Sequence, residues 1–339
     1  MSPRNRRPLN VSFRHGSSAE RVFRSQSGLP TGEAIAPGVK PTPPHDLLFH
    51  GGKTIKDLQF TNTYVGADAW PKSDIANIDR ALSAAMSDID LNNVMAQYFS
   101  GPITSAFKGS TTLPGPAPSI VSQGDVEALV ANLDSQGKFN SFDIASTVFN
   151  FLLPPGTVLN DDSGTTGGLD QKSPSAAVRR GPIPTDDEAD SLHGLGGYHG
   201  SVHTPSGKTI YYAIGVYSET RADGTENGIT AFDQPWKNVV ATFYHELNEA
   251  RTDADVEDAI RAGNDPNGVK FLGWTSRQGE ECGDFPVFEA GPDLSKVFQE
   301  VPLTAGGSTV SVQFQYSNAV HGPEGPIKTP HQASKKKSA

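Results

Sequence analysis

The clearest pattern along the chain is a run of apolar residues with helical spacing between positions 233 and 252. They recur every three or four positions, at Trp236, Val239, Val240, Phe243, Leu247 and Ala250. Asp233 is a favourable N-cap, and Pro235 suits the first turn, where its missing N–H costs no hydrogen bond. The pattern predicts an amphipathic helix with one face on a core and its polar face open as the floor of a cleft.

Other segments predict further helices and several strands. Helical spacing covers 75–98 and 124–133. Segments rich in β-branched and aromatic residues predict strands near 58–65, 103–107, 147–153, 208–217 and 309–316. We therefore expect an α+β fold, a mixed β-sheet with the helix of 233–252 packed against it.

Polar segments divide the chain. Residues 1–45 are rich in Arg, Ser, Pro and Gly without a sustained period, and predict a disordered basic segment. Residues 326–339 predict a basic disordered tail, which leaves 46–325 as a single α+β domain of catalytic type. Within it, 160–197 is crowded with Gly, Asp, Ser and Pro and predicts a long loop, either a mobile flap or an insertion.

The charge distribution limits the partners. The net charge is −10, but residues 1–45 carry +5 and residues 326–339 carry +4, which leaves −19 for 46–325. So acidic a body argues against nucleic acid as a partner. No run approaches 18 apolar residues, so we expect no membrane span. We also expect no standard signal peptide, because no apolar stretch follows the N-terminal arginines. Localisation and oligomeric state stay open.

The polar face of the predicted helix carries the sequence H-E-x-x-E, one residue away from the H-E-x-x-H signature of zinc hydrolases. His245 and Glu249 lie one helical turn apart, so both can bind one metal ion. Glu246 lies beside them and is the candidate catalytic base that takes a proton from water.

A catalytic zinc normally has three protein ligands, so a further ligand is needed. By analogy with gluzincin-like enzymes, Glu281 supplies it, and Asp284 either orients His245 or binds the metal itself. Asp255 is an alternative, since it follows Glu249 by six residues, a spacing found in metzincin-type sites.

Two histidines flank a predicted glycine-rich turn before the predicted strand of 208–217. His199 and His203 are candidates for stabilising an oxyanion, with His199 as the second catalytic residue, or for binding the metal. The single cysteine, Cys282, excludes an intrachain disulfide, and neighbouring acids make it a poor nucleophile.

These residues predict a zinc-dependent hydrolase, most simply a metallopeptidase whose strand at 209–217 pairs with an extended peptide. Calcium or manganese are alternatives to zinc, because the predicted ligands contain one histidine and two carboxylates. The competing hypothesis is a non-enzymatic binding module in which a metal only stabilises the fold.

Several short motifs in a fixed order resemble those of the exordium-like, or phosphate-induced, protein family. They are F-H-G-G at 49–52, F-L-L-P-P-G at 151–156, G-Y-H-G-S at 197–201, H-E-L-N-E-A-R-T-D at 245–253 and E-C-G-D at 281–284. The resemblance covers residues 47–320. It implies a secreted or cell-wall-associated protein that binds a wall polymer or a protein partner, without an established enzymatic activity. The chain departs from the family pattern at Ala254, where proline is usual, and in lacking paired cysteines and a signal peptide.

Overall fold

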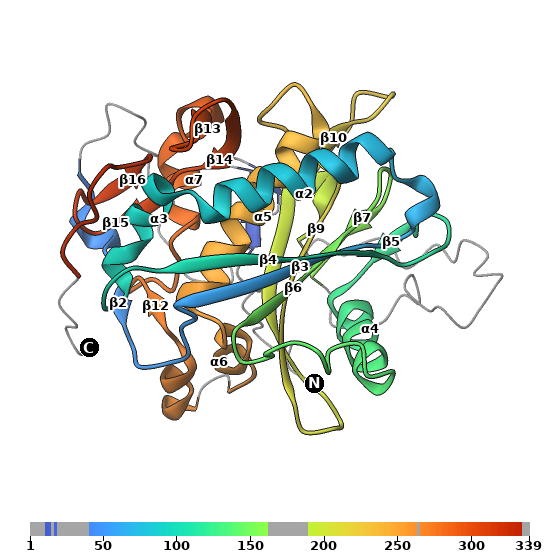
Figure 1. The fold of residues 1–339 in the computed structure, drawn as a ribbon, viewed down its shortest axis with the longest axis horizontal. Coiled ribbons are helices and arrows are strands. Elements are labelled where there is room, and N and C mark those ends of the chain that lie inside the picture. Colours follow the sequence, from blue (N-terminus) through green and yellow to red (C-terminus); the bar gives the residue numbers. More distant parts are fainter. Residues whose placement is uncertain (1–10, 15–16, 19–40, 162–188, 263–264, 334–339) are drawn as a thin grey trace.

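A computed structural model describes residues 11–14, 17–18, 41–161, 189–262 and 265–333. Its centre is a six-stranded sheet in the order β1-β8-β9-β6-β3-β4 (Figure 1). Four strands, β9, β6, β3 and β4, are parallel, while β8 is antiparallel to β9 and β1 is antiparallel to β8. The bounds are β1 Val11–Phe13, β3 Asp57–Tyr64, β4 Thr104–Thr112, β6 Thr147–Leu152, β8 Leu195–His203 and β9 Thr209–Gly215. The expected mixed sheet is therefore confirmed.

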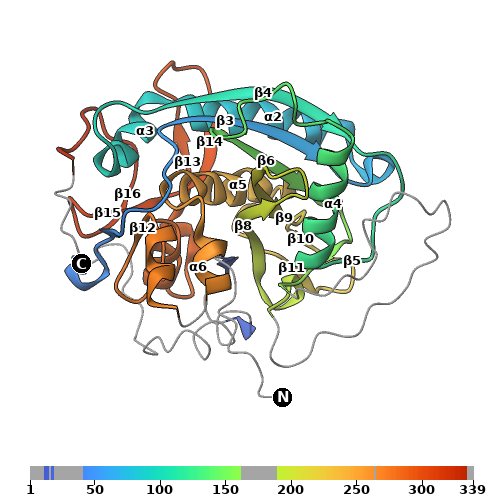
Figure 2. The same cartoon turned by 90° about the horizontal axis from the view of Figure 1, so that it is seen from below.

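The helices cover both faces of this sheet. Their bounds are α2 Lys72–Ser87, α3 Ile89–Met95, α4 Gln123–Ser135, α5 Pro235–Thr252, α6 Val256–Ala262 and α7 Asp284–Ala290. In Figure 2, β8 and β9 lie between α5 on one side and α4 on the other. Parallel strands need crossover connections; α2 and α3 connect β3 to β4, and α4 connects β4 to β6.

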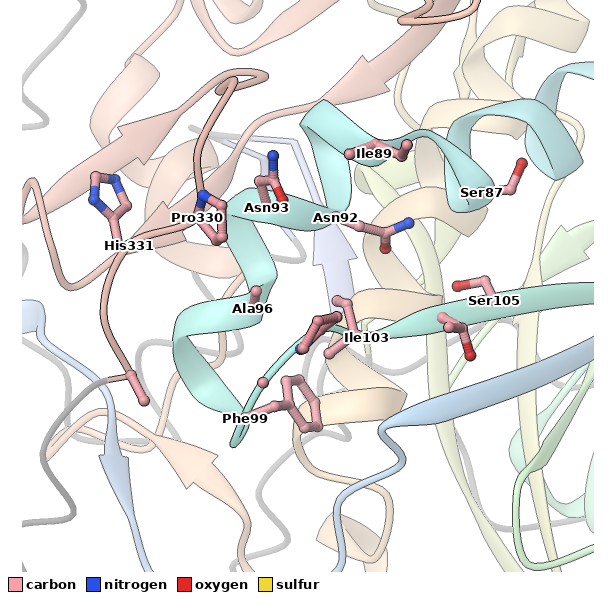
Figure 3. A pocket seen from close by; sticks show the side chains of 14 residues that line it. Ser87, Ile89, Asn92, Asn93, Ala96, Phe99, Ile103, Ser105, Pro330 and His331 are labelled. Atoms are coloured by element: carbon pink, nitrogen blue, oxygen red, sulfur yellow. The ribbon is translucent and has the colours of Figure 1, made fainter.

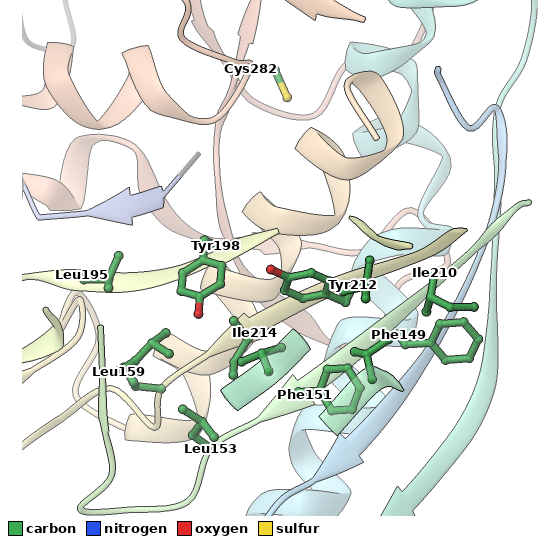
Figure 4. Packing of buried hydrophobic residues seen from close by; sticks show 14 of the residues in the cluster. Phe149, Phe151, Leu153, Leu159, Leu195, Tyr198, Ile210, Tyr212, Ile214 and Cys282 are labelled. Atoms are coloured by element: carbon green, nitrogen blue, oxygen red, sulfur yellow. The ribbon is translucent and has the colours of Figure 1, made fainter. Parts of the chain in front are cut away.

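Successive side chains of β6 point to opposite faces of the sheet and contribute to two hydrophobic cores. Val148 and Leu152 belong to the cluster that contains the apolar residues of α2 and α5. Phe149 and Phe151 belong to the cluster on the α4 side, together with residues of β8 and β9 (Figure 4). All six residues of β6 are buried, as expected for a central strand covered on both faces.

Small two-stranded sheets complete the described structure. They pair β2 with β12, β5 with β7, β10 with β11, β13 with β14 and β15 with β16. The bounds are β2 Leu48–Phe49, β5 Ile120–Val121, β7 Val158–Leu159, β10 Glu219–Thr220, β11 Glu226–Asn227, β12 Trp274–Thr275, β13 Phe298–Pro302, β14 Thr309–Gln313, β15 Gln315–Ser317 and β16 Gly322–Glu324. Of these strands, β14 bears on function, because it packs against α5.

The prediction for α5 was right in position and wrong in environment. The helix begins at Pro235, but its N-cap is Gln234 rather than Asp233. No side chain caps the first turn, and the Asn238 side chain accepts hydrogen bonds from the backbone N–H groups of Ala231 and Phe232 in the preceding loop. Every residue from Asn238 to Thr252 is buried. The expected open polar face is absent because β8, β9, α2 and β14 pack around the helix.

Two strand predictions also need correction. The strand predicted at 209–217 is β9, which lies between β6 and β8, so neither of its edges is free to pair with a peptide. His199 and His203 do not flank a turn, because both belong to β8.

The ends and the long loop are described only in part. Val11–Phe13 form β1, a strand that the sequence does not predict, and β8 begins at Leu195, inside the segment predicted as loop. In the predicted tail, Ile327 donates a backbone hydrogen bond to the Asp90 carbonyl. Pro43–His45, inside the segment predicted as disordered, form a short 3-10 helix. Residues 1–10, 15–16, 19–40, 162–188 and 334–339 of the predicted disorder and loop lie outside the described residues.

Candidate metal centre

Three elements meet at one buried cluster of histidine and glutamate side chains. The helix α5 contributes His245, Glu246 and Glu249, the strand β8 contributes His199, and the loop before α7 contributes Glu281. All five side chains are 0% exposed. The structure thus brings His199 into contact with a motif 46 residues later in the chain, through the packing of α5 on β8.

The two histidines approach the same glutamate oxygen. His245 Nε2 is 3.0 Å from Glu249 Oε2, and His199 Nδ1 is 3.7 Å from that atom. Ligand atoms lie close enough to share one ion in two sets, His199 with Glu249 and Glu281, and His245 with Glu246 and Glu249. Glu249 belongs to both sets and is the centre of the cluster.

The hydrogen bonds around each imidazole orient it. His245 Nδ1 contacts Gln313 Oε1 at 2.8 Å, and His199 Nε2 contacts the Asp253 carbonyl oxygen at 3.2 Å. An oxygen that can only accept a hydrogen bond fixes the proton on the facing nitrogen. When each imidazole is neutral, as metal binding requires, the opposite nitrogens, His245 Nε2 and His199 Nδ1, carry the lone pairs, and both face Glu249.

Gln313 connects the cluster to the chain before α7. Its Nε2 donates to the Gly283 carbonyl, and the Gly283 N–H donates to Glu249 Oε1 at 3.0 Å. A side chain at position 283 is excluded, since a Cβ there would lie 2.4 Å from His245 Nδ1. The glycine of the E-C-G-D motif is thus needed for this close approach, whereas sequence reasoning missed Gln313 because it lies on a distant strand.

The electrostatic environment is strongly negative. Buried carboxyl groups outnumber histidines here, and they belong to Glu246, Glu249, Asp253, Glu281 and Asp284. Burial alone would lower the pKa of His245, but the neighbouring carboxylates of Glu249, Glu246 and Asp284 together outweigh it and raise that pKa to about 10. Burial, reinforced by neighbouring carboxylates, raises the pKa of Glu281 well above its ordinary value. A cluster of this kind is stabilised by a bound cation.

Several ligand-type atoms of the cluster have no hydrogen-bond partner among the described residues. They are His199 Nδ1, His245 Nε2, Glu249 Oε2 and both carboxylate oxygens of Glu281. His245 Nε2 and Glu249 Oε2 are 3.0 Å apart, yet their geometry is not that of a hydrogen bond. Buried polar atoms are nearly always satisfied, so unsatisfied atoms gathered in one place fit a metal ion.

The remaining predicted residues lie outside the two sets. Asp284 accepts a hydrogen bond from the Glu281 backbone N–H at 2.8 Å. Asp284 was predicted to orient His245, but the residue that contacts His245 Nδ1 is Gln313. Asp255 is only partly buried. His203 is exposed and contacts Asp258 and Thr209.

Other parts of the chain limit access to the cluster. The strand β1 pairs with β8 from Leu195 to Tyr198, next to His199, and it also contacts α5 and α7. It therefore lies along the edge of the sheet that borders the cluster. Cys282 is buried as well, and burial raises the pKa of its thiol well above the ordinary value, in agreement with its exclusion as a nucleophile.

Comparison with protein-family models, curated proteins and solved structures finds no match to this chain. Among the described helices, none has the length and apolar character needed to cross a lipid bilayer. The function must therefore be argued from the cluster itself.

Proposed function

We propose that this protein binds one zinc ion between α5 and β8, held by Glu249 Oε2, which both ligand sets contain, and by one nitrogen from each set, His245 Nε2 and His199 Nδ1. The two histidines belong to different sets, so they would have to close on the ion as it binds. The observation that carries the proposal is the convergence of unsatisfied, fully buried ligand atoms on Glu249. Two imidazole nitrogens favour zinc, which accepts N and O ligands, over calcium, which prefers oxygen alone. Manganese remains compatible with this donor set. Glu281 is the alternative third ligand; its Oε2 lies 3.6 Å from Nε2 of His199.

We further propose that the protein is a zincin-like hydrolase acting on peptides. A bound zinc ion would supply Lewis-acid chemistry by polarising a substrate carbonyl. Glu246 is the residue suited to take a proton from water, because its Oε2 lies 3.4 Å from His199 Nδ1, within the ligand cluster. Opening of the edge covered by β1 would be needed to admit a substrate.

Complete burial favours a second candidate, a structural zinc in a non-enzymatic binding module of the exordium-like type. Structural zinc sites are closed by protein ligands, whereas catalytic sites keep one position open. In this module the ion would join β8 to α5, and the outer surface would bind a wall polymer or a protein.

Metal analysis of the purified full chain tests the common part of both candidates. We expect about one zinc per chain, and its loss in His199→Ala and in His245→Ala. His203→Ala is the matched control, because the same residue type is removed from the same strand outside the cluster. A wild-type protein that neither contains nor takes up zinc would overturn the proposal.

Glu246→Gln separates the two candidates. A hydrolase retains the metal in this variant and loses peptide cleavage by about 100-fold or more. If zinc-loaded wild type cleaves no peptide in a mixed library, the structural role is the better explanation.

A further inference from the structure

Arg251, in the last turn of α5, is a fully buried guanidinium without a carboxylate partner among the described residues. Its Nη1 donates to Asn92 Oδ1 at 2.9 Å, and its Nη2 donates to the Thr104 carbonyl at 2.8 Å and to Ser105 Oγ at 2.7 Å. All these acceptors are neutral. An arginine guanidinium keeps its positive charge at neutral pH. Buried charges are usually paired, which makes this one an exception.

The three acceptors of Arg251 also line a pocket of about 680 Å³ between α3, the start of β4 and the C-terminal residues. Figure 3 shows Asn92 and Ser105 facing this hollow. The remaining wall is largely apolar and includes Ile89, Ala96, Phe99, Ile103 and Pro330. The pocket is thus apolar over most of its surface, with a buried cation behind its polar residues.

We propose that this pocket binds a small monocarboxylate, with its apolar body against Phe99 and Ile103 and its carboxylate turned toward Arg251. Arginine binds carboxylates with paired N–H groups, and the Asn92 side chain is the neutral group that such a carboxylate would replace. The pocket shares no residue with the proposed metal site, because Arg251 and the lining residues belong to neither ligand set.

The charges around the pocket agree with an anionic ligand. Lys56 Nζ donates to the Ser100 carbonyl, next to the pocket residue Gly101, and forms no ion pair within the described structure. Three acids lie near the pocket and are already engaged. Asp57 accepts a hydrogen bond from the Thr104 hydroxyl at 2.8 Å, Asp88 accepts one from the Thr304 backbone N–H, and Asp90 pairs with Lys328. Asp57 is not within ion-pair distance of Arg251, so the guanidinium retains its capacity for a carboxylate.

The test compares hexanoate with 1-hexanol, an uncharged molecule of the same length, as ligands of the full chain. We expect calorimetry to show hexanoate binding about tenfold more tightly, because only the carboxylate can pair with the guanidinium. NMR shifts of the backbone amides from Gly101 to Ser105 should report the location. Equal affinity of the two probes, no binding, or shifts confined to another region would each overturn the proposal.

Asn92→Asp supplies a carboxylate from the protein itself and should reduce hexanoate affinity to that of hexanol. Asn93→Asp is the matched control, since it adds the same charge to the same pocket. Each substitution also removes one amide donor to a backbone carbonyl, Met86 for Asn92 and Ile327 for Asn93. Equal loss in both variants would contradict a specific role of Arg251. If Asn92→Asp fails to fold, the comparison of hexanoate with 1-hexanol on wild type still shows whether the pocket prefers a carboxylate.

Discussion

At the scale of single residues, the cluster depends on which nitrogen of each histidine is free. Gln313 and the Asp253 carbonyl oxygen each occupy one nitrogen and leave the other directed at Glu249. A hydrogen-bond acceptor behind a metal-binding histidine fixes the tautomer and orientation of its ring. In the proposed site, His199 of β8 would supply the second histidine that the H-E-x-x-E motif lacks.

Gln313→Leu should weaken zinc binding by about 10- to 100-fold while every proposed ligand remains present. The reason is that His245 loses the acceptor that fixes its Nδ1 proton. Competition with a chromophoric chelator measures the affinity. Gln313→Glu, which keeps an acceptor, should restore most of it, and Gln315→Leu controls for loss of another buried glutamine. Equal affinities of Gln313→Leu and Gln315→Leu would show that Gln313 has no positioning role.

A second residue prediction concerns Asp134, which anchors the β8–β9 hairpin to α4. Hydrogen bonds from Lys208 and then Ser206 lower the pKa of Asp134 from 3.8 to about 2. Because the folded-state pKa is depressed, the stabilisation is present above pH 4 and is lost as the pH falls toward 2. Asp134→Asn should therefore lower the melting temperature at pH 7, and its difference from wild type should shrink between pH 4 and pH 2.

Melting curves at several pH values check this, with Asp233→Asn as the control. Asp233 is an exposed carboxylate, so its removal changes the net charge without touching the hairpin. A difference between wild type and Asp134→Asn that stays constant down to pH 2.5 would refute the assignment.

At the scale of elements, local patterns predict where helices and strands lie, but not what packs on them. The apolar spacing of Val239, Phe243 and Leu247 predicts α5 within two residues of its start. The same spacing cannot distinguish a solvated polar face from one buried against other elements, because β8 and β14 come from distant segments. Likewise, the residues of β9 predict a strand without indicating that both of its edges are paired. His199 and Glu249 could be selected by residue type, whereas Gln313 carries no local signal.

The strand β1 offers a prediction at this scale, since it pairs with β8 beside the cluster. Ser12→Pro removes a backbone N–H from β1, and proline disrupts pairing within a strand. We expect EDTA to extract zinc from this variant on the order of fivefold faster than from wild type, because one backbone hydrogen bond contributes about 1 kcal/mol. Ser12→Ala keeps the N–H and serves as the control. Equal extraction rates would mean that β1 does not limit access.

At the scale of the whole molecule, the proposed metal site joins segments that are far apart in the sequence. His199 lies in the central sheet, His245 and Glu249 on the helix that packs against it, and Glu281 before α7. The body of the chain, residues 46–325, carries a net charge of −19. Without a cation, the buried carboxylates of the cluster add local repulsion to this excess and favour exposure to water.

Removal of the metal should therefore destabilise the entire fold rather than one loop. A ligand present at 1,000 times its dissociation constant adds about 4 kcal/mol to the free energy of unfolding, so zinc removal should lower the melting temperature by on the order of 10 °C. Calorimetry of zinc-loaded and chelator-treated protein measures the difference, which should vanish in His245→Ala and persist in His203→Ala. If the two forms of wild type melt at the same temperature, the ion does not join β8 to α5. The unsatisfied atoms around Glu249 would then require another explanation, since no described lysine or arginine forms an ion pair with Glu249 or Glu281.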